Sequence, residues 1–149
     1  MRKPDKPSLA TNGDVILSAK DLTIRLPPNM ERKNAVENIS FDLMAGEMLC
    51  IVGESGSGKS VTANAIMGLL PSSVKVTGGS IHFKGHDLAK ARKRVLQELR
   101  GRSVSIIFQD PLSALNPLMT IGRQITEVMV AHRVGDAASR AAKVVNLLT

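Results

Sequence analysis

Residues Gly53–Ser60 read Gly-Glu-Ser-Gly-Ser-Gly-Lys-Ser, the most informative segment of the chain. It fits the pattern G-x-x-x-x-G-K-[ST], which joins a strand to a helix in phosphate-binding loops. The apolar run Met48–Val52 precedes it and predicts a strand covered on both faces of a sheet. A helical stripe of apolar residues over Lys59–Leu70 follows it, and Pro71 is expected to end that helix. The order strand, glycine-rich loop, helix therefore predicts a phosphate site.

The chemistry of the loop explains its spacing. Glycines let successive backbone N–H groups turn inward around a phosphate without Cβ clashes, and the positive end of the following helix points at the same anion. Lys59 is expected to reach the β- and γ-phosphates, and the Ser60 hydroxyl is expected to be a ligand of Mg²⁺. A turn that merely joins a strand to a helix does not require Lys followed by Ser.

A second group of residues follows the apolar segment Ser103–Phe108, which predicts another strand. We interpret Gln109 as the functional residue here, with its amide oxygen near the metal or the attacking water. Asp110 is the alternative, as the metal-binding aspartate, but Gln109 separates it from the strand and Pro111 follows it. A plain junction between strand and loop is the third interpretation.

The rest of the chain predicts strands first and helices later. Val15–Leu26 predicts a strand interrupted near Lys20–Asp21, and Val36–Leu43 predicts a second strand. Within Val74–Leu88 a short strand pair is expected, with turns at Gly78–Gly79 and Gly85. The predicted helices are Ala89–Leu99, Ile121–Arg133 and Asp136–Leu148, the last with Asp136 as N-cap. This order predicts an α/β fold with a helical addition at its end.

Composition limits the possible functions. The chain has 149 residues, 43% hydrophobic and 22% charged, which argues against disorder. No apolar run approaches the roughly 18 residues of a membrane-spanning helix. The single cysteine, Cys50, excludes an internal disulfide framework and predicts a small core residue. A net charge of +7 permits anionic partners, but an aromatic content of 2% argues against base stacking, and no nucleic acid partner is expected.

Other polar residues predict little chemistry. The basic run Lys90–Arg102 predicts a solvated helix face, with contact to a membrane partner or lipid headgroups as the alternative. His82, His86 and His132 are too scattered for a metal site.

Ile51–Pro71 and the segment Ile106–Ile125, with its sequence FQDPLSALNP, resemble the ATP-binding subunits of ABC importers. The resemblance covers nearly all of Val15–Thr149 and is strongest to the oligopeptide/dipeptide/nickel subfamily. It implies a sheet core of the P-loop NTPase type with an N-terminal antiparallel β region and the start of a helical subdomain, in a truncated chain. The implied parts are a flexible tail (1–14), an ATP-binding core (15–120) with a P-loop (53–60) and a Q-loop (109–120), and an incomplete helical subdomain (121–149).

The same resemblance implies the site and the partners. Lys59 and Gln109 would be catalytic, and Ser60 and Gln109 would hold Mg²⁺. The implied ATP-binding residues are Gly53, Glu54, Ser55, Gly56, Ser57, Gly58, Lys59, Ser60 and Val61. The implied partners are transmembrane permease subunits, a second ATP-binding subunit in a homo- or heterodimer and, indirectly, an external solute-binding protein. The place would be the cytoplasmic face of the inner membrane, and the cargo peptides or similar small solutes.

Three family features are missing from these 149 residues: an LSGGQ-like signature, an apolar strand ending in Asp-Glu, and a switch histidine. Thr77–Ser80 (TGGS) only superficially resembles the signature and predicts a turn. Leu26–Ala35 contains no aromatic residue, so any adenine contact there is expected to be aliphatic or weak. We expect this chain to bind MgATP weakly, to hydrolyse it negligibly and to be poorly stable. The alternatives are a non-catalytic remnant and a complete P-loop kinase or GTPase-like enzyme, which would need Asp110 and an N-K-x-D motif that the sequence lacks.

Overall fold

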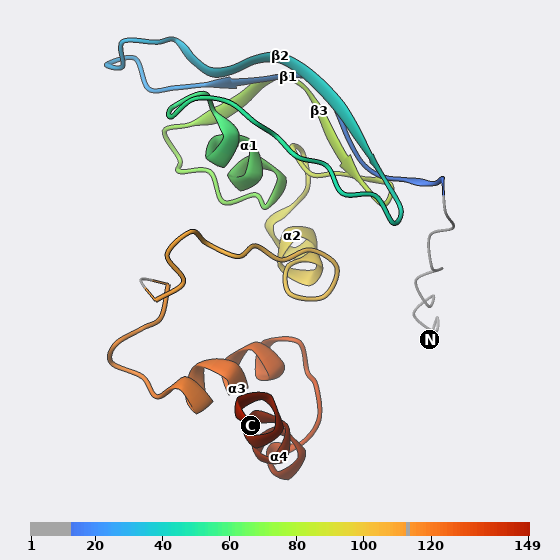
Figure 1. Cartoon of the computed structure of the whole chain (residues 1–149), viewed down its shortest axis with the longest axis vertical. Helices are drawn as coiled ribbons and strands as arrows, with labels where there is room; N and C mark the ends of the chain where they lie inside the picture. Colours follow the sequence, from blue (N-terminus) through green and yellow to red (C-terminus); the bar gives the residue numbers. More distant parts are fainter. Residues whose placement is uncertain (1–12, 113) are drawn as a thin grey trace. The chain divides into compact units, whose positions relative to one another are not determined.

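The computed structural model describes residues 13–112 and 114–149, in two compact units that divide between Leu96 and Gln97 (Figure 1). The first unit contains the sheet and the glycine-rich loop, and the second contains the two C-terminal helices. Most of the predicted tail, residues 1–12, lies outside the described residues. The units are treated separately below.

The first unit is built on an antiparallel sheet with strand order β2-β1-β3-β4. The strands are β1 (Val15–Arg25), β2 (Asn34–Met44), β3 (Lys75–Phe83) and β4 (His86–Asp87). Figure 1 shows α1 (Lys59–Ile66) under one face of the sheet. Alternate apolar residues of the strands fill the core, and Leu22, Ile24 and Ile81 are its largest fully buried side chains. The antiparallel region expected from the sequence is therefore present.

The predicted interruption of the first strand is confirmed. Asp21 has a φ of 47°, and the pairing of β1 with β2 shifts register between Ala19 and Leu22. The Asp21 N–H instead donates to Ser40 Oγ at 2.8 Å. This bulge brings backbone carbonyls of β1 towards β3.

The turn predicted at Gly78 and Gly79, which lie opposite this bulge, is wrong. Thr77–Ser80, predicted as a turn, lies inside β3. Gly79 has a φ of 75°, and a Cβ there would collide with the carbonyl oxygens of Lys20 and Asp21. Gly78 and Gly79 therefore let two strands pass closely rather than reverse the chain. The turn predicted at Gly85 is confirmed, because Lys84 and Gly85 connect β3 to β4 with φ values of 46° and 82°.

The two strands predicted directly before the glycine-rich loop and before Gln109 are wrong for this structure. Met48–Val52 forms no strand, with Met48 87% and Val52 89% exposed, and Cys50 is exposed rather than in the core. Ser103–Phe108 has only an isolated parallel bridge, between Arg100 and Val104, and Ile107 is 93% exposed. An apolar run shows which residues favour burial, but a strand also needs a neighbour for its ladder hydrogen bonds. In the described part of the chain the assigned sheet pairs other residues.

Two helices differ in length from their predictions. α1 ends at Ile66 rather than Leu70, because Gly68 takes a φ of 61° and Leu69 N–H donates to the Asn64 carbonyl at 2.8 Å. This glycine C-cap ends the helix before Pro71 acts. α2 (Lys93–Leu99) begins later than the predicted Ala89, whose N–H donates to the Asp87 carboxylate at 3.1 Å.

The second unit confirms the two C-terminal helices within about two residues. α3 (Ile121–Ala131) is capped by the Thr120 side chain. α4 (Ala137–Leu148) has the predicted N-cap, because Asp136 Oδ1 accepts from Ser139 N–H at 2.8 Å and the Ser139 hydroxyl accepts from Asp136 N–H. This capping box holds the pKa of the Asp136 carboxyl below its usual value, chiefly through the Ser139 backbone N–H. Within residues 13–112 and 114–149, no helix is long and apolar enough to cross a bilayer.

Candidate phosphate-binding site

The glycine-rich loop passes directly over β2 before it enters α1. Gly58 is the N-cap residue of α1, with a φ of 96°. A Cβ on Gly58 would lie 2.5 Å from the Ala35 carbonyl oxygen and 2.7 Å from Val36 Cγ2. Both the backbone conformation and the packing therefore require glycine here, and together they fix where the loop crosses the sheet.

The start of α1 is arranged for an anion. The Gly58 carbonyl accepts from the Thr62 N–H at 2.8 Å and from the buried Thr62 hydroxyl at 3.0 Å, which anchors the first turn from below. Gly58 has no side chain that could cap the helix, so the first backbone N–H groups are left for a ligand. Ser60 is exposed at this end of α1.

Lys59 folds its side chain back over the loop. Its Nζ donates to the carbonyl oxygens of Gly53 and Glu54, both at 2.6 Å, and to Ser57 Oγ at 3.2 Å. These bonds close the loop around one ammonium group. The predicted cation is therefore inside the glycine-rich loop, at the start of α1.

Arg32 also contacts this loop, and sequence reasoning did not find it. It lies between β1 and β2, and its Nη2 donates to the Gly56 carbonyl oxygen at 2.5 Å. The partners are 24 residues apart. No local pattern reports such a contact, because it depends on how the β1–β2 loop folds towards the glycines.

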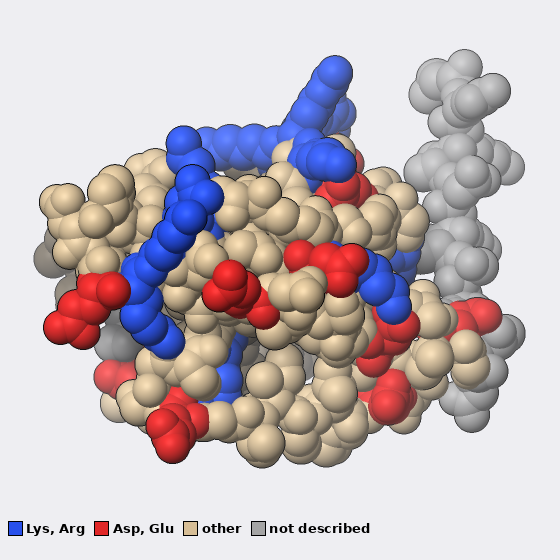
Figure 2. Space-filling view, turned by 90° about the horizontal axis from the view of Figure 1, so that it is seen from above, with Lys and Arg blue, Asp and Glu red and all other residues tan. Residues whose placement is uncertain are grey.

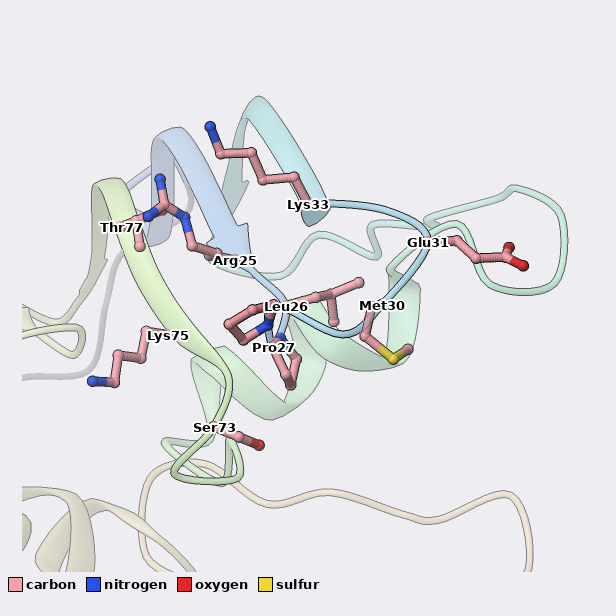
Figure 3. Close-up of a pocket in the computed structure, with 10 residues that line it drawn as sticks. Arg25, Leu26, Pro27, Met30, Glu31, Lys33, Ser73, Lys75 and Thr77 are labelled. Carbon is pink, nitrogen blue, oxygen red and sulfur yellow. The ribbon is translucent and has the colours of Figure 1, made fainter.

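A cavity of about 650 Å³ opens beside the same β1–β2 loop (Figure 3). Figure 3 shows Leu26, Pro27 and Met30 in its wall, with the basic side chains of Arg25 and Lys75 on the neighbouring strands. Its lining residues are Arg25, Leu26, Pro27, Pro28, Met30, Glu31, Lys33, Ser73, Lys75 and Thr77. The lining combines apolar, basic and polar side chains with the acidic Glu31, and it contains no aromatic residue.

Gln109 and Asp110 lie in the second unit, at an exposed bend after Phe108. The structure therefore brings Lys59, Ser60 and the glycines together but does not test whether Gln109 joins them. The metal role of Ser60 and Gln109 stays a prediction. Residues 13–112 and 114–149 contain no group of three or more His, Cys, Asp or Glu side chains that could hold a metal ion.

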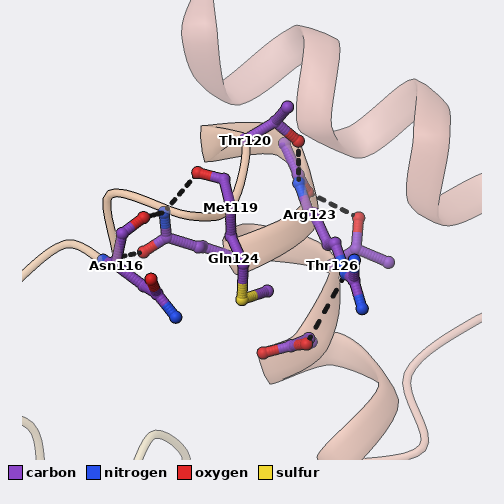
Figure 4. Close-up of polar contacts among 8 residues, drawn as sticks. Asn116, Met119, Thr120, Arg123, Gln124 and Thr126 are labelled. Atoms are coloured by element: carbon purple, nitrogen blue, oxygen red, sulfur yellow. Dashed lines mark hydrogen bonds and ion pairs between the residues drawn. The ribbon is translucent and has the colours of Figure 1, made fainter.

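Gln124 organises the second half of the loop that follows Gln109, and sequence reasoning missed this residue too. Its Oε1 accepts from Asn116 N–H, and its Nε2 donates to the carbonyl oxygens of Asn116 and Met119, each at 3.0 Å (Figure 4). The amide thus satisfies backbone groups of an irregular segment from the first turn of α3. We call residues 116–124 with these bonds the amide clamp.

The basic residues of Lys90–Arg102, predicted to form a solvated helix face, are mostly exposed. In the view of Figure 2, Lys and Arg side chains project from the surface among Asp and Glu side chains. Lys20 Nζ lies 2.8 Å from Asp42 Oδ2, and its hydrogen bond lowers the pKa of the Asp42 carboxyl.

Comparisons with known proteins agree with this geometry. The family model described as ABC transporter matches residues 36–149. The peptidoglycan transport ATP-binding protein YejF of Agrobacterium fabrum is 42% identical over 93% of this chain and 26% of that protein. The dipeptide transport ATP-binding protein DppD of Bacillus subtilis is 42% identical over 90% of this chain and 40% of its own length. The oligopeptide transport ATP-binding protein OppD of Escherichia coli is 42% identical over 85% of this chain and 37% of its own length.

A solved structure confirms the fold class. An ATP-binding cassette, described as a dimer in a post-hydrolysis state bound to ADP and Pi, matches with a TM-score of 0.71 and 23% identity. The match covers 89% of this chain and 55% of that one. The 149 residues span between 26% and 40% of the length of the curated relatives named above.

Proposed function

Because this chain belongs to the ABC transporter family, whose model matches residues 36–149, we propose that it binds MgATP as part of an importer's ATP-binding subunit. The observation that supports this best is the loop Gly53–Ser60, where Lys59 Nζ lies within 2.6 Å of two loop carbonyls at the start of α1. A flexible cation and helix N–H groups that converge on one loop form a site for a polyphosphate.

We assign separate tasks to the loop residues. The backbone N–H groups of Gly53–Ser60 and of Val61 hold the phosphates, and Lys59 transfers its hydrogen bonds from the loop to the β- and γ-phosphates. The Ser60 hydroxyl would supply one oxygen ligand to Mg²⁺, an ion that favours oxygen donors. When bound, the ion neutralises phosphate charge. Gln109 would face the metal or the attacking water, and the Q-loop 109–120 would connect nucleotide state to the helices that begin at residue 121.

The cavity beside the β1–β2 loop fits the base of the nucleotide. Leu26, Pro27 and Met30 offer an apolar wall, and Arg25 and Lys75 add positive charge near its edge. Adenine would lie against aliphatic side chains in place of an aromatic ring. Aliphatic contact loses the stacking contribution of an aromatic platform, which is consistent with weak binding.

The wider role follows from the relatives. YejF, DppD and OppD are named as transport ATP-binding proteins for peptidoglycan, dipeptides and oligopeptides. We propose that this chain acts with permease subunits and a second ATP-binding subunit at the cytoplasmic face of the membrane, in uptake of peptides or similar solutes. The parts 15–120 and 121–149 would be the ATP-binding core and the start of the helical subdomain. For the 149 residues alone we propose binding with negligible turnover.

Calorimetric titration with MgATP tests the binding. We expect saturable binding by the wild-type chain and a loss of about 10- to 100-fold in affinity for Lys59→Ala, since a lost charged hydrogen bond costs about 1.5–3 kcal/mol. Lys84→Ala is the matched control, because Lys84 lies over the Phe83 ring, 5.6 Å from its centre, and should bind as wild type. Equal affinity of Lys59→Ala and wild type would contradict the proposal.

A phosphate-release assay on the same proteins tests turnover. We expect no release above background from the wild-type chain. Release that Lys59→Ala abolishes would overturn the proposal of negligible turnover while supporting the ATP site.

A further inference from the structure

We propose that Arg32 is a positioning residue that holds the phosphate loop in its ligand-receiving shape while Lys59 moves from the loop to the ligand. This inference rests on the proposed function, because it describes how the ATP site is kept in order. It concerns an exposed side chain outside the motif Gly53–Ser60.

The segment that carries Arg32 has its own internal support. The chain between β1 and β2 is closed by a hydrogen bond from Leu26 N–H to the Lys33 carbonyl at 2.9 Å. Inside it, Met30 N–H donates to the Pro27 carbonyl at 3.2 Å. The guanidinium group therefore extends from a loop whose backbone is held at both ends by strands. From there Nη2 reaches the Gly56 carbonyl oxygen at 2.5 Å.

This contact fixes the direction of one peptide unit. The carbonyl of Gly56 and the N–H of Ser57 belong to the same planar trans peptide and point in opposite directions. With the carbonyl held by Arg32, the Ser57 N–H lies on the other side, where it donates to the Glu54 carbonyl at 3.2 Å. Gly56 is exposed, has a φ of 78° and has no atom within 4 Å of the position of a Cβ, so packing around it does not impose this orientation.

When a phosphate binds, we expect the hydrogen bonds of Lys59 to the loop to change and that of Arg32 to persist. Lys59 holds Gly53, Glu54 and Ser57 through the same ammonium group that must turn to the ligand, so those bonds weaken on binding. The bond from Arg32 to Gly56 uses none of these atoms and can persist. A planar guanidinium suits this task better than an ammonium, because its donors have fixed directions.

Magnesium tripolyphosphate and MgATP are the probes for the test, titrated into the 149-residue chain. We expect Arg32→Ala to weaken both ligands by about tenfold, as for a lost charge-assisted hydrogen bond. Arg32→Lys should recover part of the loss. Lys84→Ala is the matched control, because it removes a cation of the same charge that lies over the Phe83 ring, outside the loop and the base cavity. It should change the affinity for either probe less than about twofold.

The ligand-free protein gives an independent readout. The ¹³C carbonyl resonance of Gly56 should move in Arg32→Ala and stay in place in Lys84→Ala. Unchanged affinity in Arg32→Ala, equal losses in both variants, or a Gly56 resonance that ignores Arg32 would overturn the inference while leaving the ATP site intact. Failure of the wild-type chain to bind either probe would instead overturn the proposed function, and the inference with it.

Discussion

Gly58 shows how strictly one residue ties the loop to the sheet. Its φ of 96° suits glycine, and its absent Cβ leaves space that Ala35 and Val36 occupy. The residue thus serves local conformation and tertiary packing at the same time. Gly58 therefore fixes the position of the glycine-rich loop relative to β2.

We predict that Gly58→Ala lowers the free energy of unfolding of the first unit by about 2 to 4 kcal/mol, from overpacking and an unfavourable φ together. Urea denaturation followed by circular dichroism measures this. Gly56→Ala is the control, since it has a φ of 78° but no atom within 4 Å of its added Cβ. It should cost about 1 to 2 kcal/mol, from backbone strain alone. Equal losses for the two variants would contradict the packing argument.

The sequence predicted the residues of the phosphate loop, because their chemistry depends on spacing within eight positions. It could not predict Arg32, whose partner Gly56 is 24 residues away and is reached only after the β1–β2 loop folds. Gln124 was missed for a related reason. From the sequence, a glutamine in a predicted helix is simply a polar surface residue. Its role becomes visible only when the preceding loop folds against its amide group. Contacts between loops produce no periodic pattern of apolar residues, so the sequence alone does not reveal them.

At the scale of elements, the amide clamp gives α3 control of the loop that precedes it. We predict that Gln124→Leu accelerates hydrogen exchange at the Asn116 amide by about tenfold, because Asn116 N–H loses its acceptor on Gln124. Gln124→Glu keeps an oxygen acceptor for this N–H but loses the donors to the Asn116 and Met119 carbonyls. It should therefore exchange at an intermediate rate. Identical exchange in all three proteins would show that the clamp does not hold the loop.

The capping box of α4 makes that helix sensitive to acid. The folded state lowers the pKa of Asp136 below its usual 3.8, so the carboxylate's contribution is complete above that value and is lost as the pH falls through the folded pKa. We predict fraying of the first turn of α4 below about pH 3.8, seen as loss of protection at Ser139 N–H. Asp136→Asn keeps an uncharged cap and should show no such transition. Parallel pH profiles for the two proteins would contradict this assignment.

Element positions followed from the sequence where short-range signals act. The N-cap of α4 and the bulge at Asp21 were predictable because capping and strand interruption are local. The end of α1 was not, since Gly68 ended the helix before the proline did. Gly78 and Gly79 were misjudged because their need for glycine comes from the carbonyls of another strand.

At the scale of the whole molecule, strongly apolar segments remain outside the core. Met48 and Val52 in the first unit are 87% and 89% exposed, and Ile107 in the second is 93% exposed. The sequence identified these residues as candidates for a sheet, but a parallel ladder depends on which segments pair, and composition carries no information on that. Within the described residues the only assigned sheet is antiparallel.

We predict that the exposed apolar segment Met48–Val52 makes the chain bind a hydrophobic dye and self-associate with rising concentration. The double variant Met48→Lys with Val52→Lys should lower dye fluorescence severalfold and shift sedimentation towards the monomer. Val130→Lys with Val145→Lys adds the same charge at half-exposed helix positions and is the matched control. Equal effects of both pairs would mean that net charge, rather than this segment, governs association.

The ammonium group of Lys59 already donates hydrogen bonds to Gly53, Glu54 and Ser57. An anion that binds Lys59 must therefore compete with these bonds. A lone orthophosphate must displace these internal partners and can return few contacts. On the proposed function, a longer chain of phosphoryl groups would replace several of these bonds at once. If the loop binds MgATP as we propose, the same internal bonds would favour polyphosphates over single phosphate ions.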